Sequence, residues 1–220
     1  MADDTSSYTA VDLSQLPAPS VIESLDYETI YADFAAKVQA RNPDFDPLDE
    51  TDPAVAVAQV AAYEILILRQ RVNDAAKSVM VAYAVGTDLD QLAALFGEAR
   101  QTITPEDPIQ GLPAVKELDG DFRRRIVLAP EGYSVAGPEG AYISLALNAD
   151  ARVRDASAIG PEDQPGTVLV TVLARAGDGT APADLLQAVY SYASDESRRP
   201  LTDKVIVQSA TIIDYERAER

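Results

Sequence analysis

Apolar residues recur every three or four positions over residues 53–83, a pattern that predicts one long helix. The recurring positions are Ala58, Ala61, Ile65, Leu68, Val72, Ala75 and Val79. Such a series forms a stripe along one side of a helix, and the stripe favours packing against another helix. A helix of about thirty residues is about 45 Å long, because each residue adds about 1.5 Å. This length exceeds the usual diameter of a small domain, so we expect the helix to act in assembly between subunits.

A second expected feature is an extended arm over residues 1–25, for which a disordered tail is the alternative. Leu16, Pro17 and Pro19 lie in a stretch where each proline restricts its own backbone and that of the preceding residue. A helical domain follows over residues 26–97. Asp26 is placed to cap a helix over 27–41, and Asp52 precedes a proline at the expected start of the long helix.

The rest of the chain predicts a different architecture. Residues 98–118 form a Pro-rich connecting loop, and residues 119–150 form a helical segment with helices at 119–128 and 138–148. Residues 151–220 then read strand, strand, helix, strand, with the last strand expected over 204–215. The fold class is therefore α+β: a mostly helical N-terminal part with one long bundle helix, and a small mixed C-terminal domain with an open sheet. Its last strand is expected to leave an unpaired edge, where a partner strand or a further part of the protein can add.

Composition excludes several kinds of chemistry. The 220 residues contain no cysteine and no histidine. Disulfides, thiolate nucleophiles and Ser-His-Asp triads are therefore absent, as are the commonest transition-metal ligands. We expect no enzymatic activity, no catalytic residue, no cofactor and no metal site.

The net charge of −18 bears on the partners. Binding to nucleic acid or to an anionic membrane requires clusters of Lys and Arg, so neither is an expected partner, and no small-molecule substrate is indicated. The sequence shows no signal peptide, and its most apolar stretch is too short to span a bilayer. We expect the protein to be made and used in the cytoplasm, or to enter a particle assembled there.

Three motifs resemble functional sites without matching them. The acidic residues at 44–52 lack the glycine and the glutamate of a calcium loop, and predict a solvated turn and a helix cap. Arg123, Arg124 and Arg125 are consecutive on a predicted helix, which favours a salt-bridged face or a protein contact over phosphate binding. The stretch 132–137 has its second glycine one residue too late for a nucleophile elbow.

Seven short motifs, in this order, resemble the baseplate assembly protein J family of contractile phage tails and related injection particles. They are Leu16-Pro17-Ala18-Pro19 with Leu25-Asp26-Tyr27-Glu28, Arg69-Gln70-Arg71-Val72-Asn73, Gly86-Thr87-Asp88-Leu89-Asp90, Thr102-Ile103-Thr104-Pro105, Ser134-Val135-Ala136-Gly137 with Gly140-Ala141-Tyr142, Arg199-Pro200-Leu201-Thr202-Asp203, and Val207-Gln208-Ser209-Ala210. Each motif is weakly specific by itself, and their common order over nearly all of the chain is the stronger signal.

The resemblance implies a structural role in the wedge of a tail baseplate. Two copies of such a protein bundle helices with a second wedge protein, and the wedges close a ring around the central spike hub. The ring rearranges when the tail meets its host, which lets the sheath contract. The implied partners are a second copy of the chain, other wedge proteins, and hub and sheath-proximal proteins. The implied location is the virion tail, assembled in the host cytoplasm.

The expected interface combines the stripe and the arm. Its residues are Ala58, Ala61, Ile65, Leu68, Val72, Ala75 and Val79 on the long helix, with Leu16, Pro17 and Pro19 on the arm. Members of the family usually continue further at the C-terminus, so a short member, a truncation and an ordered portion all stay open. Two other functions are also open: a carboxylate-pair glycosidase that cuts cell-wall sugars, which needs no histidine, and an acidic soluble adaptor protein.

Overall fold

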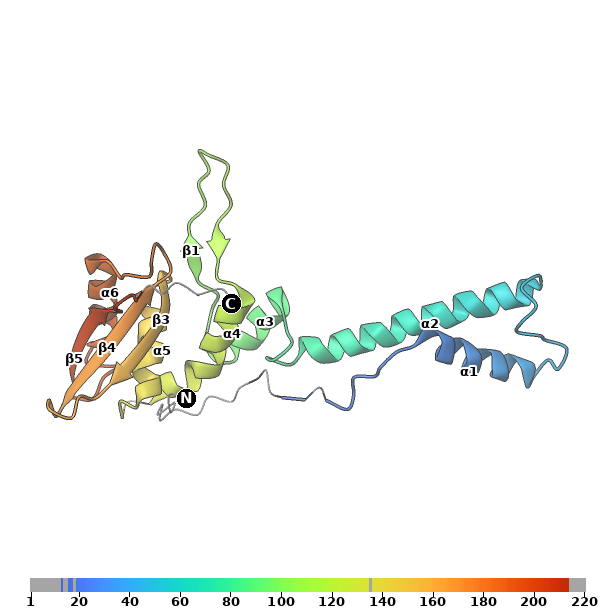
Figure 1. The fold of residues 1–220 in the computed structure, drawn as a ribbon, viewed down its shortest axis with the longest axis horizontal. Coiled ribbons are helices and arrows are strands. Elements are labelled where there is room, and N and C mark those ends of the chain that lie inside the picture. Colours follow the sequence, from blue (N-terminus) through green and yellow to red (C-terminus); the bar gives the residue numbers. More distant parts are fainter. Residues whose placement is uncertain (1–12, 14–15, 18, 135, 214–220) are drawn as a thin grey trace, which may run out of the picture. The chain divides into compact units, whose positions relative to one another are not determined.

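The structure is a computed structural model that describes residues 13, 16–17, 19–134 and 136–213 (Figure 1). The chain divides into two compact units, which we treat separately. The helical unit comprises Leu13–Leu89, and the C-terminal unit comprises the described residues from Asp90 onward. The described residues form both helices and strands, which confirms the α+β class.

The helical unit is built on two helices that pack against each other, α1 (Tyr27–Gln39) and α2 (Pro53–Ser78) (Figure 1). Each begins where the sequence predicts, because an aspartate caps it. The Asp26 carboxylate accepts the Thr29 N–H at 2.8 Å, and the Asp52 carboxylate accepts the Ala54 N–H at 2.8 Å. The core between the two helices is small and consists of Ala35, Phe45, Val55 and Ala58.

Helix α2 is shorter than its apolar pattern suggests. It ends at Ser78 rather than near residue 83, so at 1.5 Å per residue it is about 39 Å long. The chain turns at Val79, and the N–H groups of Tyr83 and Ala84 both donate to the Met80 carbonyl. This turn buries Ala84, which is 1% exposed. Burial of Ala84 outweighs the helical pattern, which continues to Ala82. The structure shows α2 paired with α1 of its own chain, so a bundle with other chains stays a prediction.

Helix α3 (Gly86–Ala94) lies at the boundary of the two units and is followed by a hairpin. The hairpin consists of β1 (Thr102–Thr104) and β2 (Val115–Lys116), which pair antiparallel within the stretch expected to be a plain connecting loop. Prolines at 105, 108 and 113 lie between the strands, and since proline has no N–H donor they keep the ladder short.

The C-terminal unit continues with α4 (Asp119–Leu128), the 3-10 helix η2 (Ala129–Tyr133) and α5 (Glu139–Ala149). Three strands, β3 (Val153–Ile159), β4 (Thr167–Ala174) and β5 (Lys204–Ser209), then form one sheet in the order β3-β4-β5. Strand β3 is antiparallel to β4 and β5 is parallel to it, with α6 (Ala183–Ala193) connecting β4 to β5. The predicted order of strand, strand, helix, strand is confirmed. The last strand ends at Ser209, earlier than predicted.

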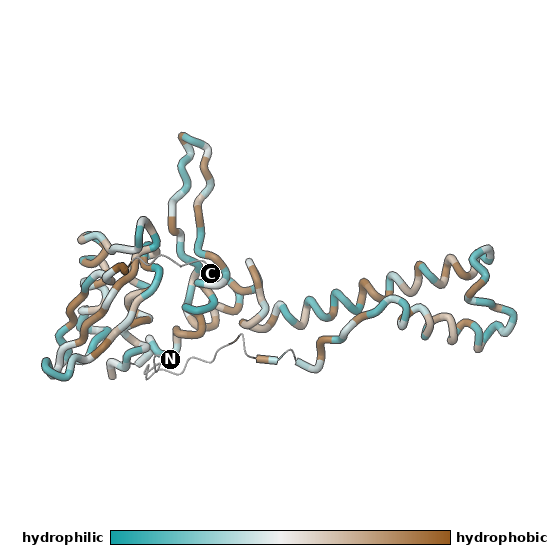
Figure 2. The backbone as a smooth tube through the Cα atoms, viewed as in Figure 1, coloured by the Kyte–Doolittle hydropathy of each residue, from teal (hydrophilic) through white to brown (hydrophobic). Residues whose placement is uncertain are grey.

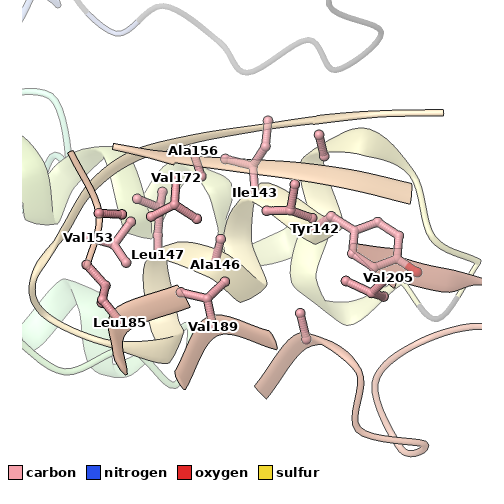
Figure 3. Close-up of a cluster of buried hydrophobic side chains, with 14 of the residues drawn as sticks. Tyr142, Ile143, Ala146, Leu147, Val153, Ala156, Val172, Leu185, Val189 and Val205 are labelled. Atoms are coloured by element: carbon pink, nitrogen blue, oxygen red, sulfur yellow. The ribbon is translucent and has the colours of Figure 1, made fainter. Parts of the chain in front are cut away.

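The core of this unit lies between the sheet and helices α5 and α6. Figure 3 shows Ile143 and Leu147 of α5 with Val172 of β4 and Leu185 and Val189 of α6 pointing into one cluster. Alternate residues of β4, Val170, Val172 and Ala174, are buried, and the residues between them are half-buried. This period of two means that the helices cover only one face of the sheet.

Candidate functional site

The face of α2 that α1 covers is defined by its buried residues. Val55, Ala58 and Ala62 are all at most 2% exposed, and Val55 and Ala58 pack against α1 and Phe45. Further along the same face lies Asn73, which is 4% exposed. Residues 55, 62 and 73 share nearly one direction, because a helix turns about 100° per residue.

Large apolar residues on the remaining circumference of α2, together with Val79 just after its end, are exposed. Leu68, Val72 and Val79 are 61%, 59% and 68% exposed, and Val57 and Val60 are 68% and 63% exposed. Leu68 lies about 140° around the helix from Asn73, at 3.6 residues per turn. We call the set Val57, Val60, Leu68, Val72 and Val79 the α2 stripe. Figure 2 shows hydrophobic segments recurring along the whole length of α2.

The predicted interface residues are placed as follows. Leu68, Val72, Ala75 and Val79 are exposed, Ala61 and Ile65 are half-buried, and Ala58 is 2% exposed. Ala58 packs against α1 of its own chain. Because no surface of Ala58 is left for a partner, we leave it out of the proposed interface. On the arm, Leu16 and Pro17 are exposed and Pro19 is half-buried.

Periodicity alone left Val57 and Val60 out of the candidate residues, although they are apolar and exposed on α2. The sequence pattern placed them outside the predicted series that runs from Ala58 to Val79, because a strict spacing of three and four selects Ala58 and Ala61 instead. The signal that could have found them is the apolar character of almost the whole circumference of the first half of α2. Deciding between the two sets requires knowing which side α1 covers.

The arm is attached to α2 through the side chain of Asn73. The Asn73 amide donates to the Glu23 carbonyl at 2.8 Å, and its oxygen accepts the Glu23 N–H at 3.0 Å. Arg69 lies 3.6 Å from the Glu23 carboxylate, and the Tyr83 hydroxyl donates to the Leu16 carbonyl at 3.4 Å. The arm therefore continues the cover that α1 provides, on the face opposite the α2 stripe. Residues 1–12, 14–15 and 18 of the predicted arm lie outside the described residues.

The acidic stretch at 44–52 forms local turns and a cap. Asp46 accepts the Leu48 N–H and Asp49 accepts the Thr51 N–H, both at 3.0 Å. Hydrogen bonds from the Thr51 hydroxyl and backbone N–H lower the pKa of Asp49. The prediction of a turn and helix cap is confirmed, and among the residues that the structure describes no group of three or more acidic side chains could hold a metal ion.

Arg125 is the centre of a buried polar cluster in the C-terminal unit. Its guanidinium lies 2.9 Å from Glu117 and 2.6 Å from Glu98, and it donates to the Ala99 carbonyl at 2.7 Å. It also donates to the side chain of Asn148. The side chains of Arg125 and Glu117 are 5% and 1% exposed, so the cluster is internal.

Arg124 points elsewhere and lies 2.6 Å from Asp155. Arg124 and Arg125 are therefore both held in ion pairs, as the salt-bridged interpretation predicts. The contacts of Arg125 join the segment after α3, the end of β2, α4 and α5. The cluster serves to hold these elements of the C-terminal unit together.

Two distant motifs meet at Gly137 and Asp203. The Tyr142 hydroxyl donates to the Asp203 carboxylate at 2.8 Å. Burial and then this hydrogen bond raise the pKa of Tyr142 well above its usual range, so the hydroxyl stays protonated. Gly137 has a φ of +73°, and a Cβ at this position would lie 2.8 Å from both Asp203 and Pro200. The glycine is required here by both its backbone conformation and the close approach.

Comparison with known proteins gives matches over both units. A model of the Baseplate J-like N-terminal domain matches residues 50–107, and one of the Baseplate J-like central domain matches residues 134–209. Baseplate protein J of Escherichia phage P2 is 44% identical over 216 residues, which cover 94% of this chain and 70% of that protein. The chain belongs to the baseplate J family.

The baseplate J-like N-terminal match contains α2, α3 and β1, and the central match contains α5 to β5. The resemblance inferred from seven short motifs is thus confirmed at the level of the family. Asn73 belongs to one of these motifs and holds the arm on α2. Gly137, Tyr142 and Asp203 belong to two others and pack together. In this baseplate J-like chain, these motif residues hold segments of the chain together.

A search of the described helices for membrane spans finds none that is long and apolar enough to cross a bilayer.

Proposed function

We propose that this chain is a structural subunit of the baseplate of a contractile phage tail or a related injection particle. Membership of the baseplate J family supports the baseplate role. The observation that carries the proposal for this chain is the α2 stripe. It leaves four apolar side chains exposed on α2 and a fifth, Val79, just after its end, whereas the other face of the helix is already covered.

The α2 stripe is proposed to pack against helices of neighbouring subunits. Full burial of a Leu or Val side chain stabilises by about 1.5–3 kcal/mol. Leu68, Val72 and Val79 each retain more than half of their exposure, so covering all three would contribute several kcal/mol. Association also costs entropy, which opposes this stabilisation. In an assembly, many such contacts together can offset that cost.

The proposed partners are a second copy of the chain, other wedge proteins, and hub and sheath-proximal proteins. In this proposal the subunits form helical bundles within a wedge, the wedges close a ring, and the ring rearranges to trigger contraction of the sheath. The protein would be assembled into the virion tail in the host cytoplasm. The net charge of −18 favours partners whose contacting surfaces are basic or neutral.

We propose no enzymatic activity. The buried Glu117 and the half-buried Glu98 both pair with the Arg125 guanidinium. A glycosidase requires two carboxyl groups that face a substrate cleft, whereas these two carboxylates are engaged in an internal ion pair. No observation favours the glycosidase or the free adaptor over the structural role.

Photo-crosslinking tests the proposal. A benzoylphenylalanine at Leu68 or Val72 is expected to crosslink to another baseplate subunit in assembled particles, because both positions face away from α1 and the arm. The same residue at Asp33, an exposed position on α1 whose side chain is 64% exposed, is the matched control. Crosslinks from Leu68 and Val72 that reach only the same polypeptide would refute the interface.

A further inference from the structure

Strand β5 forms one edge of the three-stranded sheet, and its pairing with β4 shows which of its backbone groups face outward. The N–H of Lys204 donates to the Gly166 carbonyl at 2.7 Å, and the N–H of Ala210 donates to the Val172 carbonyl at 2.8 Å. In a parallel ladder the residues that bond one neighbour alternate along the strand. Residues 204, 206, 208 and 210 therefore bond to β4. The N–H and C=O groups of Val205 and Val207 point to the free edge.

The free edge is accessible beside a groove. A groove of about 400 Å³ is lined by Leu186 and Tyr190 of α6 and by Val205, Ile206 and Val207 of β5. Ile206 points to the sheet face opposite α6, so its presence in the lining shows that the groove reaches the edge. At the far end, the Ala181 N–H donates to the Ser209 hydroxyl at 2.9 Å. The portion of the edge considered for pairing is residues 204–208, which precede this contact.

The chemistry of this edge specifies an extended strand as its occupant. Outward N–H and C=O groups on an edge are matched by the backbone of another strand. Among the described strands, none pairs with this side of β5. An added strand would also bury the apolar lining of the groove.

The side-chain pattern of β5 is self-complementary. It reads Lys204, Val205, Ile206, Val207, Gln208, which is polar at both ends and apolar in the centre. In an antiparallel pair about a twofold axis at Ile206, the outward residue Val205 lies opposite the partner's Val207. Ile206 then lies opposite its own copy, and Lys204 lies opposite Gln208 of the second copy. Apolar residues thus face apolar residues and polar residues face polar ones, as an isologous interface requires.

Local charge also permits pairing of two copies. Residues 183–209 hold three basic and four acidic side chains, a net charge of −1, whereas the whole chain carries −18. The strong repulsion expected between two acidic proteins is therefore weakest around β5 and α6. On the face that α6 covers, the groove of each copy would receive the neighbouring copy's α6 edge.

We propose that β5 is a self-association edge, at which two copies of this chain pair antiparallel and join their sheets into one of six strands. The pairing is centred on Ile206 and uses the outward backbone groups of Val205 and Val207. This inference concerns a surface separate from the α2 stripe and does not depend on the proposed function. It identifies the occupant of the edge as a second copy.

Sedimentation velocity of the purified full chain over a range of concentrations tests the pairing. A Leu68→Asp background removes self-association through the α2 stripe, so the remaining dimer reports on β5. Ile206→Lys is expected to weaken this dimer by at least about tenfold, because two lysines meet at the twofold axis and the Ile–Ile contact is lost. Ile206→Asp by itself is expected to weaken the dimer in the same way. A mixture of the two variants is expected to restore the dimer, because a lysine then faces an aspartate at the axis.

The matched control is Ile159→Lys. Ile159 is on β3, at the opposite edge, in the same row of the sheet as Leu169 and Ile206. It is 57% exposed, so the substitution places the same charge on the same sheet face away from β5. The dimer is expected to be unchanged.

Circular dichroism would detect unfolding of the Ile206 variants. A second pair of variants, at an exposed position, tests the pairing independently of that outcome. Gln208 is exposed, and Gln208→Glu is expected to strengthen the dimer a few-fold by facing Lys204 of the second copy, whereas Gln208→Lys is expected to weaken it. A chain that stays monomeric up to millimolar concentration overturns the proposal. So does a dimer that is indifferent to the Ile206 and Gln208 variants, or a mixture of Ile206→Lys and Ile206→Asp that fails to associate.

Discussion

Replacement of Leu68 by Asp separates the assembly role of α2 from its role in folding. Leu68 is 61% exposed in the chain, whereas Val55 on the covered face is 1% exposed. A substitution at such an exposed site usually changes the free energy of unfolding by at most about 0.5 kcal/mol. The isolated Leu68→Asp chain is therefore expected to fold and to remain soluble.

The same substitution has a much larger effect in the proposed assembly. There, Leu68 would lose the rest of its exposure, and the aspartate would be buried without a partner. Losing the leucine contact and burying an unpaired polar group together cost at least about 3 kcal/mol per interface. This corresponds to a decrease of about 100-fold or more in the association constant, since about 1.4 kcal/mol is tenfold. Repeated in every subunit, the loss is expected to prevent incorporation.

The assay compares the soluble chain with assembled particles. Thermal unfolding of the purified variant measures stability, and electron microscopy of particles from cells that produce the variant measures assembly. Leu48→Asp is the matched control, because Leu48 is 86% exposed, carries the same substitution and lies in the same unit. Particles with Leu68→Asp that assemble and contract normally would refute the assembly role of the stripe. Insoluble Leu68→Asp protein would instead indicate a core role for Leu68.

Three further predictions concern contacts within each unit. Asn73→Ala removes both hydrogen bonds to the Glu23 backbone and is expected to free the arm, seen as faster cleavage near residue 23 in limited proteolysis; unchanged cleavage would contradict this role. Arg125→Met leaves buried carboxylates unpaired and is expected to lower the free energy of unfolding by about 3–5 kcal/mol in urea titration, whereas a loss below about 1 kcal/mol would contradict an internal cluster. Arg152 lowers the pKa of Asp150 in the folded chain, so this pair adds stability above the ordinary pKa of 3.8, and the stability is lost as pH falls through the lowered value. Arg152→Met is expected to reduce the loss of thermal stability between neutral pH and about pH 3, and an unchanged pH profile would argue against the contribution.

The start points of the helices were predictable because short-range chemistry sets them. Asp26 and Asp52 cap the helices that follow them, and each cap contacts only residues two or three positions away. The strand at 167–174 was predictable from local sequence as well, since residues 168–173 form a continuous run of β-branched and apolar residues. The family was also visible in the sequence, because its motifs keep their order.

The end of α2 and the hairpin at 102–116 were not predictable in this way. At the end of α2, burial of Ala84 and the contact of Tyr83 with Leu16 compete with a helical pattern that continues to Ala82. The hairpin depends on pairing across a loop whose prolines indicated only irregular structure.

The sequence by itself therefore determined that α2 is a long, apolar helix and that the chain is a baseplate J-like protein. Only the tertiary structure decided which side of α2 is left for partners: α1 and the arm cover Val55, Ala58 and Asn73, and the face with Leu68 and Val72 stays open. Periodicity identifies apolar positions on a helix without stating which of them its own chain will bury. That allocation is made by contacts between residues far apart in the sequence, such as Glu23 and Asn73, whose energies no local pattern contains.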